Sequence, residues 1–562
     1  MKRLKTSKTS IATLLYNTSP RLLVLSIIAG SIAGSLYGLI IPFALYGVYS
    51  RANTAESPAN DISLPGFVNE NYPLIFFSLC IIIVLMKLIS IIMVSNIAKT
   101  ATANLKIVIA RKIQKMLVAH VEKEGLSRLL NIIGADSQAV ASAATAIPML
   151  LVSALTIVGM LCYLASLNIY VFFIFLTAII VGSFLFQVPA NISMRLFQKA
   201  RDLQDTSQEG IRGLIFGVYE LKLDQNKTDK FMEDEFISPL NKALRIEKLG
   251  DSLLHTAGNF SDLLVFLIIG LVVFFLPNAI NLAPTQSYGV IMALLYVAGP
   301  IGNILSNIQS LQRGSVSLAR IHALQDLDEE VVSPNAPVIK EWTTFNIKNI
   351  TYNYPKQIEG QDTPFSLSKT TLSFEKGKIY FIVGGNGSGK STLSKIISLH
   401  YIPTTGSVSL DETTITSDNI VSARSKISVI YSNYYLFRTL YREYTDIDVK
   451  RINDYLEKFG LKGKTEFING EFTTIKLSDG QRRRLALLVA LLEDKDIYVF
   501  DEWAADQDPE HKKLFYTEIL PSIRALNKLV IVITHDDRYF NCADEVIFMN
   551  EGKVVSNDQK TL

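Results

Sequence analysis

The chain has 562 residues, which is long for one domain, and 49% of them are hydrophobic while only 19% are charged. The net charge of +3 gives no bulk reason to expect a nucleic-acid partner. Three scattered cysteines, Cys80, Cys162 and Cys542, show neither metal-binding nor pairing spacing, which excludes a disulfide scaffold. The apolar excess lies in the first 310 residues, so a membrane part is expected there.

Six stretches are long and apolar enough to cross a bilayer as helices, since a span needs about 20 residues. The fourth is the clearest, and the sixth is the weakest because Gly299 and Pro300 break it. Any one of them also fits a buried helix of a soluble protein. Six such runs without a matching polar face indicate a membrane domain. We place the spans at roughly 22–48, 73–97, 145–166, 169–189, 257–277 and 287–307.

The distribution of lysine and arginine predicts the orientation of these spans. Seven basic residues lie between spans two and three, and ten lie between spans four and five. The first loop instead sets Arg51 against the acidic residues Glu56, Asp61 and Glu70. Both termini and the two long basic segments are therefore expected in the cytoplasm.

The two basic segments have the pattern of helices that extend the spans. Residues 107–114 and 216–223 mix charged and apolar side chains at helical spacing. One interpretation is that these are ordinary amphipathic helices that pack on themselves.

Two ionisable residues lie within or beside the predicted spans. Lys87 is flanked by apolar residues in the second span, and Asp262 lies near the start of the fifth. A charge in the membrane is costly and by default suggests function, so both are candidates for a substrate cavity, where they can also pair with each other. The alternatives are that Lys87 extends towards the lipid headgroups and that Asp262 sits at the interface.

The strongest motif follows the apolar run 379–383, which predicts a strand. Its glycines allow the backbone to wrap closely around a phosphate, and the N–H groups that begin the next helix meet the anion. Lys390 is placed to reach the β- and γ-phosphates, and the Ser391 hydroxyl to hold Mg²⁺. A chance glycine turn is the alternative, but the preceding strand and the helical pattern after it favour binding of a nucleoside triphosphate. The motif consists of Gly384, Gly385, Asn386, Gly387, Ser388, Gly389, Lys390 and Ser391, and Thr392 follows it.

Two further apolar runs end in residues that act on phosphates. Residues 497–502 predict a buried strand that ends in Asp501, which can reach Mg²⁺, and Glu502, which can polarise a water molecule. Residues 529–535 predict a similar strand that ends in His535. A lone histidine is usually structural, but at the end of a strand in such a sheet a γ-phosphate contact is favoured.

Residues 477–481 precede a predicted helix and read Leu477, Ser478, Asp479, Gly480 and Gln481. This segment resembles the L-S-x-G-Q signature of ABC ATPases. The resemblance implies that Ser478 and Gly480 contact ATP held by a second, opposed ATPase domain. It also implies the Walker A role for Lys390, the Walker B role for Asp501 and the catalytic-base role for Glu502. His535 then takes the switch-histidine role.

Other positions follow from the same resemblance. Asp508 falls at the D-loop position, and Tyr354 is similar to the aromatic residue that stacks on adenine, with Tyr352 as the alternative. Ser432 stands where the family usually has the Q-loop glutamine, so a direct contact with Mg²⁺ is in doubt there and a water bridge is the alternative. Asp479 replaces the first glycine of the usual signature, but the remaining signature residues give no reason to infer lost activity.

The whole chain resembles a half-transporter of the ABC exporters. The implied fold is an all-α domain of six transmembrane helices, similar to type IV exporters, at 1–325, followed by an α/β P-loop ABC nucleotide-binding domain at 326–562. In that family the cytoplasmic helical extensions dock on the ATPase domain. Residues 501–509, 481–485 and 220–223 resemble the branch that exports cyclic peptides and siderophores, including pyoverdine-type and lipopeptide-type exporters.

The resemblance predicts ATP-driven export, with Mg²⁺, of a small peptide or siderophore-like cargo across the inner membrane by alternating access. One copy carries one phosphate loop and one signature, so two copies are needed to complete opposed sites, and a homodimer is expected. A heterodimer with a related chain is the alternative. For function, the alternatives are a multidrug or lipid-flipping exporter and, from another class, an ATP-gated channel or membrane regulator.

Overall fold

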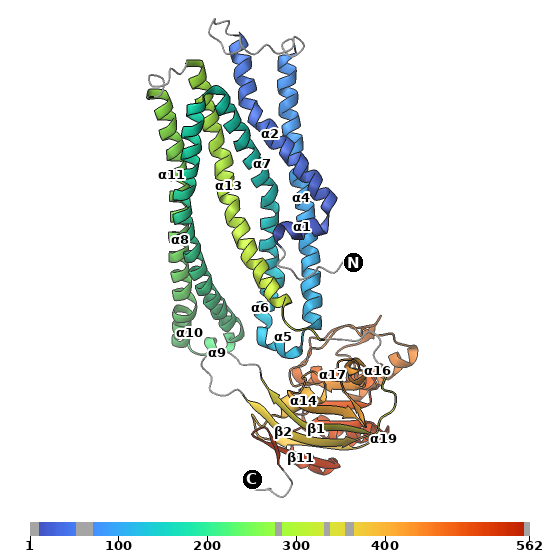
Figure 1. Ribbon diagram of the computed structural model, residues 1–562. Coiled ribbons are helices and arrows are strands. Elements are labelled where there is room, and N and C mark those ends of the chain that lie inside the picture. Colours follow the sequence, from blue (N-terminus) through green and yellow to red (C-terminus); the bar gives the residue numbers. More distant parts are fainter. Residues whose placement is uncertain (1–9, 52–70, 276–283, 331–337, 355–364, 556–562) are drawn as a thin grey trace. The chain divides into compact units, whose positions relative to one another are not determined.

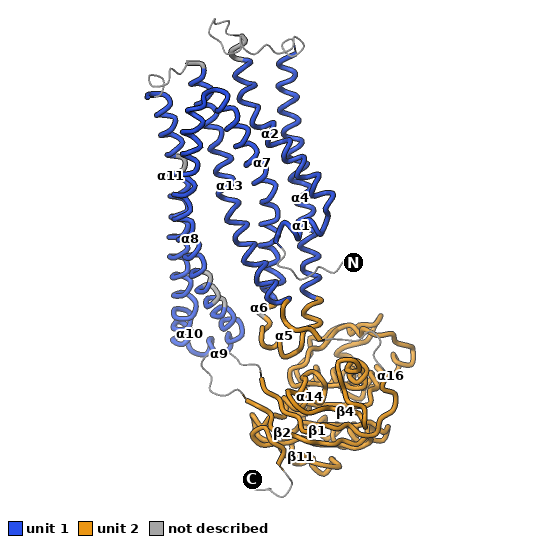
Figure 2. The backbone as a smooth tube through the Cα atoms, in the orientation of Figure 1, with its two compact units in different colours: residues 1–110, 130–325 blue, residues 111–129, 326–562 orange. Residues whose placement is uncertain are grey.

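The computed structural model describes residues 10–51, 71–275, 284–330, 338–354 and 365–555. The chain divides into two compact units, which Figure 2 shows in blue and orange. Unit 1 comprises residues 1–110 and 130–325, and unit 2 comprises residues 111–129 and 326–562. The segment 111–129 thus belongs with the C-terminal part, whereas the sequence analysis counts it with the transmembrane domain.

Unit 1 is built from helices, most of which run side by side (Figure 1). Among the described residues, six helices are long and apolar enough to cross a membrane, which confirms the six predicted spans. The six are α2 (Pro20–Arg51), α4 (Tyr72–Lys115), α7 (Ser137–Leu167), α8 (Ile169–Phe216), α11 (Ser238–Phe274) and α13 (Pro284–Gln325). Shorter helical elements are α1 (Ile11–Thr18), η2 (Ile132–Asp136), α9 (Val218–Lys222), α10 (Gln225–Phe231) and η3 (Met232–Ile237).

The predicted break of the sixth span is wrong. Helix α13 continues through Gly299 and Pro300. A proline removes one backbone hydrogen bond, and neighbouring groups in a helix bundle can satisfy the carbonyl that it frees. The first predicted helical extension is confirmed, because α4 continues through residues 107–114 to Lys115. Helix α8 also extends beyond the fourth span but ends at Phe216, and the predicted segment 216–223 forms the separate short helix α9. The acidic residues of the first loop lie outside the described residues.

Small residues allow the helices of unit 1 to approach closely. A side chain at Gly34 would collide with Val152 and Leu155 of α7, and one at Gly38 would meet the backbone of Gly159. Such glycine contacts are typical of helix packing in membranes, where apolar side chains gain little from leaving lipid.

Unit 2 contains a six-stranded sheet of order β12-β11-β3-β10-β9-β6 and a four-stranded antiparallel sheet of order β2-β1-β4-β5. In the larger sheet, β11, β3, β10, β9 and β6 are parallel, and β12 is antiparallel to β11. Its strands are β3 (Ile379–Gly384), β6 (Ile427–Ile430), β9 (Ile497–Asp501), β10 (Leu529–Ile533), β11 (Glu545–Asn550) and β12 (Lys553–Val555). The smaller sheet has β1 (Thr344–Asn353), β2 (Ser366–Glu375), β4 (Thr405–Leu410) and β5 (Thr413–Thr414), while β7 (Phe467–Ile468) pairs with β8 (Glu471–Phe472).

Helices cover the parallel sheet, so its strands are buried on both faces and read as continuous apolar runs. In β3, Phe381 belongs to one core and its neighbours Tyr380 and Ile382 belong to the other. The helical elements of unit 2 are α5 (Val118–Glu124), α14 (Lys390–Ile397), α15 (Ile420–Arg424), α16 (Asp446–Lys458), α17 (Asp479–Leu492), α18 (Pro509–Leu514), η4 (Phe515–Ile519), α19 (Leu520–Ala525) and η5 (Asp537–Cys542). Helix α6 (Leu126–Asn131) begins in unit 2 and ends in unit 1.

Candidate functional site

The glycine-rich segment forms a loop between β3 and α14. Gly387 and Gly389 have φ values of 78° and 99°, in the left-handed region that only glycine adopts without strain. Gly389 is the residue that precedes α14, and Lys390 is the first residue of that helix. The N–H groups at the start of α14 therefore follow the loop directly, as an anion site requires.

The side chain of Lys390 folds back over this loop. Its Nζ donates hydrogen bonds to the carbonyl oxygens of Gly384, at 2.8 Å, and Gly385, at 2.9 Å. Burial lowers the pKa of Lys390, while the carboxylates of Glu502 and Asp501 oppose this shift. A charged ammonium is thus held where it can meet a phosphate.

Two features of the loop fit a bound phosphate chain. The Ser388 hydroxyl is buried and has no hydrogen-bond partner among the described residues, so a ligand oxygen would satisfy it. A Cβ added at Gly385 or Gly387 would meet nothing within 4 Å, which leaves the loop open on that side. The residues present therefore fit ATP.

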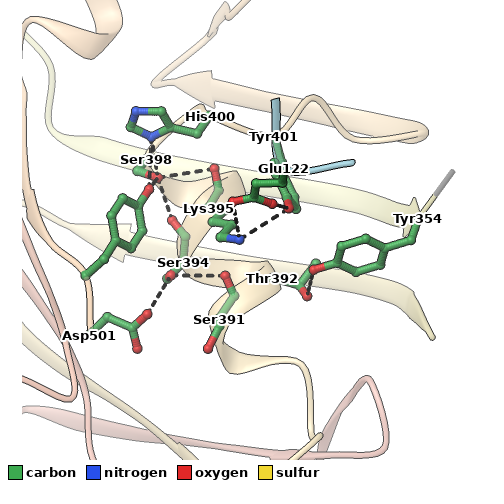
Figure 3. A network of polar contacts seen from close by, with 11 residues as sticks. Glu122, Tyr354, Ser391, Thr392, Ser394, Lys395, Ser398, His400, Tyr401 and Asp501 are labelled. Carbon is green, nitrogen blue, oxygen red and sulfur yellow. Dashed lines mark hydrogen bonds and ion pairs between the residues drawn. The ribbon is translucent and has the colours of Figure 1, made fainter. Parts of the chain in front are cut away.

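Asp501 ends β9 beside α14. It is buried, and its Oδ2 accepts a hydrogen bond from Ser394 Oγ at 3.4 Å (Figure 3). Burial and the neighbouring charge of Glu502 raise the pKa of Asp501 to about 6. A divalent cation would oppose both effects, so the carboxylate suits Mg²⁺, together with the Ser391 hydroxyl of α14.

Glu502 and His535 lie side by side after two neighbouring strands. The Nε2 atom of His535 is 3.1 Å from Oε1 of Glu502. The Glu502 backbone has a φ of 53°, and its carbonyl oxygen accepts a hydrogen bond from Arg483 at 2.6 Å. The structure thus brings together the two residues proposed to act on the attacking water and the γ-phosphate.

Of the two candidate tyrosines, Tyr354 lies beside the phosphate loop. Its hydroxyl is 2.9 Å from Thr392 Oγ1, on the first turn of α14 (Figure 3). Tyr352 is buried in the core and stacks on Tyr401 with ring centroids 4.6 Å apart. The less buried Tyr354 is the better placed of the two to offer a ring face to adenine.

Ser432 is exposed, and its side chain makes no hydrogen bond with any residue that the structure describes. The residue before it has a defined role that the sequence analysis missed. Tyr431 Oη is 2.5 Å from Ser398 Oγ and 2.9 Å from His400 Nδ1, which ties the end of β6 to the chain after α14. The signal for this contact is weak, since a tyrosine after a strand is common.

The signature residues begin α17. Ser478 caps this helix: its Oγ accepts from the N–H of Gln481, whose Oε1 accepts from the N–H of Ser478. Ser478 is exposed, and a Cβ at Gly480 would meet the backbone oxygen of Asp506 at 3.3 Å. Asp479 is exposed and lies 3.6 Å from Arg482, so it leaves the cap intact. Leu477, which precedes the cap, packs against the core.

Asp508, at the D-loop position, caps α18 and does not point freely from the loop. It accepts a hydrogen bond from the N–H of His511 at 2.9 Å, and His511 Nδ1 is 2.8 Å from the same carboxylate. These hydrogen bonds from His511 lower the pKa of Asp508. A loop between Asp501 and Asp508 is therefore fixed at both ends.

A second contact that the sequence analysis missed involves α5. Glu122 Oε1 is 2.8 Å from Nζ of Lys395 on α14, and the Tyr401 hydroxyl donates to Glu122 Oε2 (Figure 3). Val118 and Ala119 of the same short helix pack against the core of unit 2. Helix α5 is thus attached to the helix that begins with Lys390.

Of the two candidate cargo residues, only Lys87 has a side chain that the structure describes. The Lys87 ammonium lies over the ring of Tyr37, 5.5 Å from its centroid. The side chain of Asp262 lies outside the described residues. The roles of both residues stay predictions.

Comparison with known proteins adds to this geometry. Residues 367–505 match the ABC transporter family. The chain is 31% identical over 471 residues to the ATP-binding protein SyrD of Pseudomonas syringae pv. syringae, a match that covers 81% of this chain and 82% of SyrD. It is 23% identical to the ATP-dependent lipid A-core flippase of Vibrio vulnificus (strain YJ016), with coverage of 86% of this chain and 84% of the flippase.

The fold is similar to that of a bacterial Atm1-family ABC exporter with ATP bound. The TM-score is 0.73 at 17% sequence identity, and the match covers 96% of this chain and 95% of that chain. At this identity the likeness concerns the fold alone.

Proposed function

Because the chain belongs to the ABC transporter family, we propose that it exports a cyclic or modified peptide, a siderophore precursor or a lipopeptide across the inner membrane. It is an ATP-hydrolysing exporter and a multi-pass membrane protein. One observation carries the proposal: the same chain holds six helices able to span a membrane and one full set of phosphate-loop, carboxylate, histidine and signature residues.

In this proposal, different residues of unit 2 have different roles in ATP hydrolysis. The loop ahead of α14 and the Lys390 ammonium hold the phosphates, and the ring of Tyr354 holds adenine. Glu502 accepts a proton from, or orients, the attacking water, and His535 steadies the γ-phosphate end. Mg²⁺, which Ser391 and Asp501 would hold, neutralises charge that develops on the phosphates.

In this proposal, each complete ATP site is formed by two copies of the chain in a homodimer. Ser478 is an exposed helix cap in its own unit, so its hydroxyl is available to a nucleotide on another copy. Two copies in twofold symmetry would each lend a signature to the other. ATP then favours the state in which both signatures are engaged, and hydrolysis releases that state, which drives alternating access.

The resemblance of residues 220–223, 481–485 and 501–509 to the peptide- and siderophore-exporting branch favours a peptide among the possible cargoes. The likeness to lipid A-core flippases supports lipid movement as the second candidate. In both cases the ATPase unit and the termini would lie in the cytoplasm, as the basic segments predict.

Uptake into inside-out vesicles tests the proposal. ATP should drive accumulation of a labelled lipopeptide or cyclic peptide, and a Lys390→Ala vesicle should accumulate none. Movement of a labelled lipid between leaflets, without uptake of any peptide, would establish the flippase instead. ATP-dependent ion conductance without uptake of either would make the protein a gated channel.

A further inference from the structure

Three side chains link the signature helix to the segment that follows Glu502. Arg484 lies on the second turn of α17, His511 lies in α18, and Asp508 precedes α18. The Nδ1 atom of His511 is 2.8 Å from Oδ1 of Asp508, and its Nε2 atom contacts Nη1 of Arg484. We call this Asp508–His511–Arg484 chain the clasp. It connects the D-loop position to the helix that begins with the signature.

The arginine end of the clasp holds the signature itself. Arg484 Nε donates a hydrogen bond to the carbonyl oxygen of Gly480 at 3.4 Å, and its Nη1 donates to the carbonyl oxygen of Phe459 at 3.0 Å. Phe459 follows α16, which packs against α17 (Figure 1). The amide of Gln507 donates to the same Gly480 oxygen at 3.2 Å. Gly480 is therefore held both from its own helix and from the segment just before Asp508.

The partners of His511 determine which of its nitrogens carries the proton. An arginine side chain can only donate hydrogen bonds, and it stays charged in proteins. Nε2 of His511 must therefore accept the bond from Arg484, so the imidazole is neutral and its single proton lies on Nδ1, facing the Asp508 carboxylate. A second proton, on Nε2, would set donor against donor and positive charge against positive charge. The His511 side chain is 18% exposed, so protons from solvent can reach it.

Charged groups on the neighbouring elements decide the effect of that second proton. Arg484 faces Nε2 from α17, and Asp508 faces Nδ1 from the segment before α18. The chain after α16 approaches Nε2 at Gly460, where an added Cβ would be 3.7 Å away and no charge is present. The other charged residues beside these positions, none of which bonds to His511 in the described part of the chain, are Lys458 and Lys462, paired with Glu518 and Glu457, and on α18 Glu510, Lys513 and Lys512, which is paired with Asp536.

The two ends of the clasp therefore respond differently to acid. Hydrogen bonds from the backbone N–H and the ring of His511 lower the pKa of Asp508, so its carboxylate remains an acceptor at mildly acid pH. A protonated His511 keeps this partner and repels Arg484. The clasp thus opens at its arginine end, where Gly480 is held.

We propose that His511 is a positioning residue for ATP hydrolysis and that it acts only in its neutral form. Neutral His511 fixes Arg484, and through it the Gly480 carbonyl, in place relative to Asp508. Protonation frees the arginine, so the signature is no longer held against the D-loop position. Hydrolysis then falls as the pH falls. The inference rests on the proposed contact of the signature with ATP on the opposed copy, and it adds a proton-sensitive step to that shared site.

The test measures ATP hydrolysis by the full-length protein in nanodiscs at about pH 8 and about pH 5.5, since histidine changes its charge between these values. His511→Gln is the central variant, because a carboxamide donates and accepts hydrogen bonds but does not titrate. His511→Leu removes both bonds. At about pH 8, His511→Gln should stay within about threefold of wild type, whereas His511→Leu should lose at least about tenfold.

The response to acid distinguishes positioning by a neutral histidine from a merely structural role. The ratio of wild-type to His511→Gln activity should fall at least about threefold between about pH 8 and about pH 5.5. Other titrating groups, including Asp501 and His535, are present in both proteins, so their effects cancel in this ratio. His255→Gln, which replaces an exposed histidine of α11, is the matched control, and its ratio to wild type should not change with pH. ATP binding should be equal among the variants at each pH, because the phosphate loop is untouched.

Several outcomes would overturn the inference. A ratio of wild-type to His511→Gln activity that is constant with pH would remove the proton-sensitive step. Wild-type hydrolysis by His511→Leu at about pH 8 would remove the positioning role, and a loss of ATP binding as large as its loss of hydrolysis would place the effect in its own phosphate loop. If His511→Leu misfolds in thermal unfolding, the His511→Gln ratio still decides.

Ser478→Ala separates this inference from the proposed function. Normal hydrolysis by Ser478→Ala would mean that the shared site itself fails, whatever the His511 variants do. An inactive Ser478→Ala, with His511 variants that match wild type at both pH values, would leave the shared site standing and remove only the role of His511.

Discussion

The backbone of Glu502 is held in a conformation that a non-glycine residue adopts at a cost of about 1–3 kcal/mol. Its carbonyl is fixed by Arg483, which also forms an ion pair with Asp506 at 2.6 Å. The Trp503 indole in turn donates to the carbonyl oxygen of Arg483 at 2.9 Å. Contacts with α17 thus hold the strained backbone in place, and the Glu502 carboxylate lies 3.1 Å from His535 Nε2.

Changing Glu502 to Gln should lower ATP hydrolysis by about 100-fold or more, because the amide cannot accept the proton of the attacking water. Binding of ATP should remain, since the phosphate loop is untouched. Phosphate release and nucleotide binding on the purified protein measure the two effects. Glu466→Gln, at an exposed position away from the site, is the matched control. Near-normal turnover in Glu502→Gln would move the base elsewhere, with His535 first.

The buried Ser388 hydroxyl leads to an unusual expectation for stability. Without nucleotide it has no partner among the described residues, so Ser388→Ala should leave the free energy of unfolding unchanged or raise it by up to about 1 kcal/mol. The same change should weaken ATP binding, because a phosphate contact is lost. Thermal unfolding without nucleotide and an ATP titration measure both.

Ser398→Ala is the control for this experiment. Ser398 is equally buried, but its hydroxyl donates to the carbonyl oxygen of Ser394 at 2.8 Å and lies beside Tyr431. Its loss should lower stability by about 1 kcal/mol. A similar loss of stability in Ser388→Ala would show that its hydroxyl is satisfied within the protein.

The motif residues were open to prediction from the sequence because each chemical role has a local signature. Lys390 and Ser391 follow a glycine pattern, and Glu502 and His535 end apolar runs that only a buried parallel strand explains. The environment of these residues was not open to prediction. The strain at Glu502 and the cap formed by Asp508 depend on partners that local sequence does not specify.

At the level of elements, the attachment of α5 to α14 shows a second limit. Glu122 and Lys395 are 273 positions apart, and neither lies in a recognisable motif. Helical spacing predicted the extensions of the spans, and family resemblance predicted that they dock, but neither identifies the contacting residues. Helix α13 shows the opposite kind of error, a break that was predicted but does not occur. Pro300 is a local signal for a helix break, but the packing of the helix bundle keeps α13 continuous.

Helix α5 should transmit movement between the phosphate loop and the spans. Glu122→Gln removes the charge that faces Lys395 but keeps the shape of the side chain. Both groups are partly exposed, so the loss of stability should be small, about 0.5 kcal/mol. Basal ATP hydrolysis should stay within about twofold of wild type, while stimulation by cargo should fall, because α5 no longer follows α14.

Parallel assays of basal and cargo-stimulated hydrolysis test this expectation. Glu124→Gln is the matched control, since Glu124 pairs at 3.0 Å with Arg128 of its own segment and not with α14. Equal stimulation in Glu122→Gln and wild type would mean that the contact only holds α5 in place. A loss of basal hydrolysis as large as the loss of stimulation would indicate damage to α14 itself.

For the whole molecule, the position of the signature residues determines how many copies of the chain an ATP site needs. In its own unit Ser478 caps α17, and in the part of the chain that the structure describes its side chain forms no hydrogen bond with the phosphate loop. A single copy therefore holds both halves of a site without joining them. This is the physical reason to expect two copies, and it agrees with the expectation from the single phosphate loop and single signature of the sequence.

Mixing two inactive variants tests the shared site. Lys390→Ala should abolish ATP binding by its own phosphate loop, and Ser478→Ala should abolish the contribution of the signature, so each homodimer lacks both sites. A mixed dimer keeps one intact pair, the Lys390 of one copy with the Ser478 of the other. Co-expression should therefore restore part of the wild-type ATP hydrolysis, measured on dimers purified through two different tags so that only mixed pairs remain. The mixed dimers could form and bind ATP at one site and still be as inactive as either parent. That result would mean either that both sites must be intact for turnover or that Ser478 acts within its own copy. A double variant tests whether Ser478 acts within its own copy. One chain carries both Lys390→Ala and Ser478→Ala and is paired with a wild-type chain. A signature that acts within its own copy leaves this pair with one active site, whereas a shared signature leaves it with none.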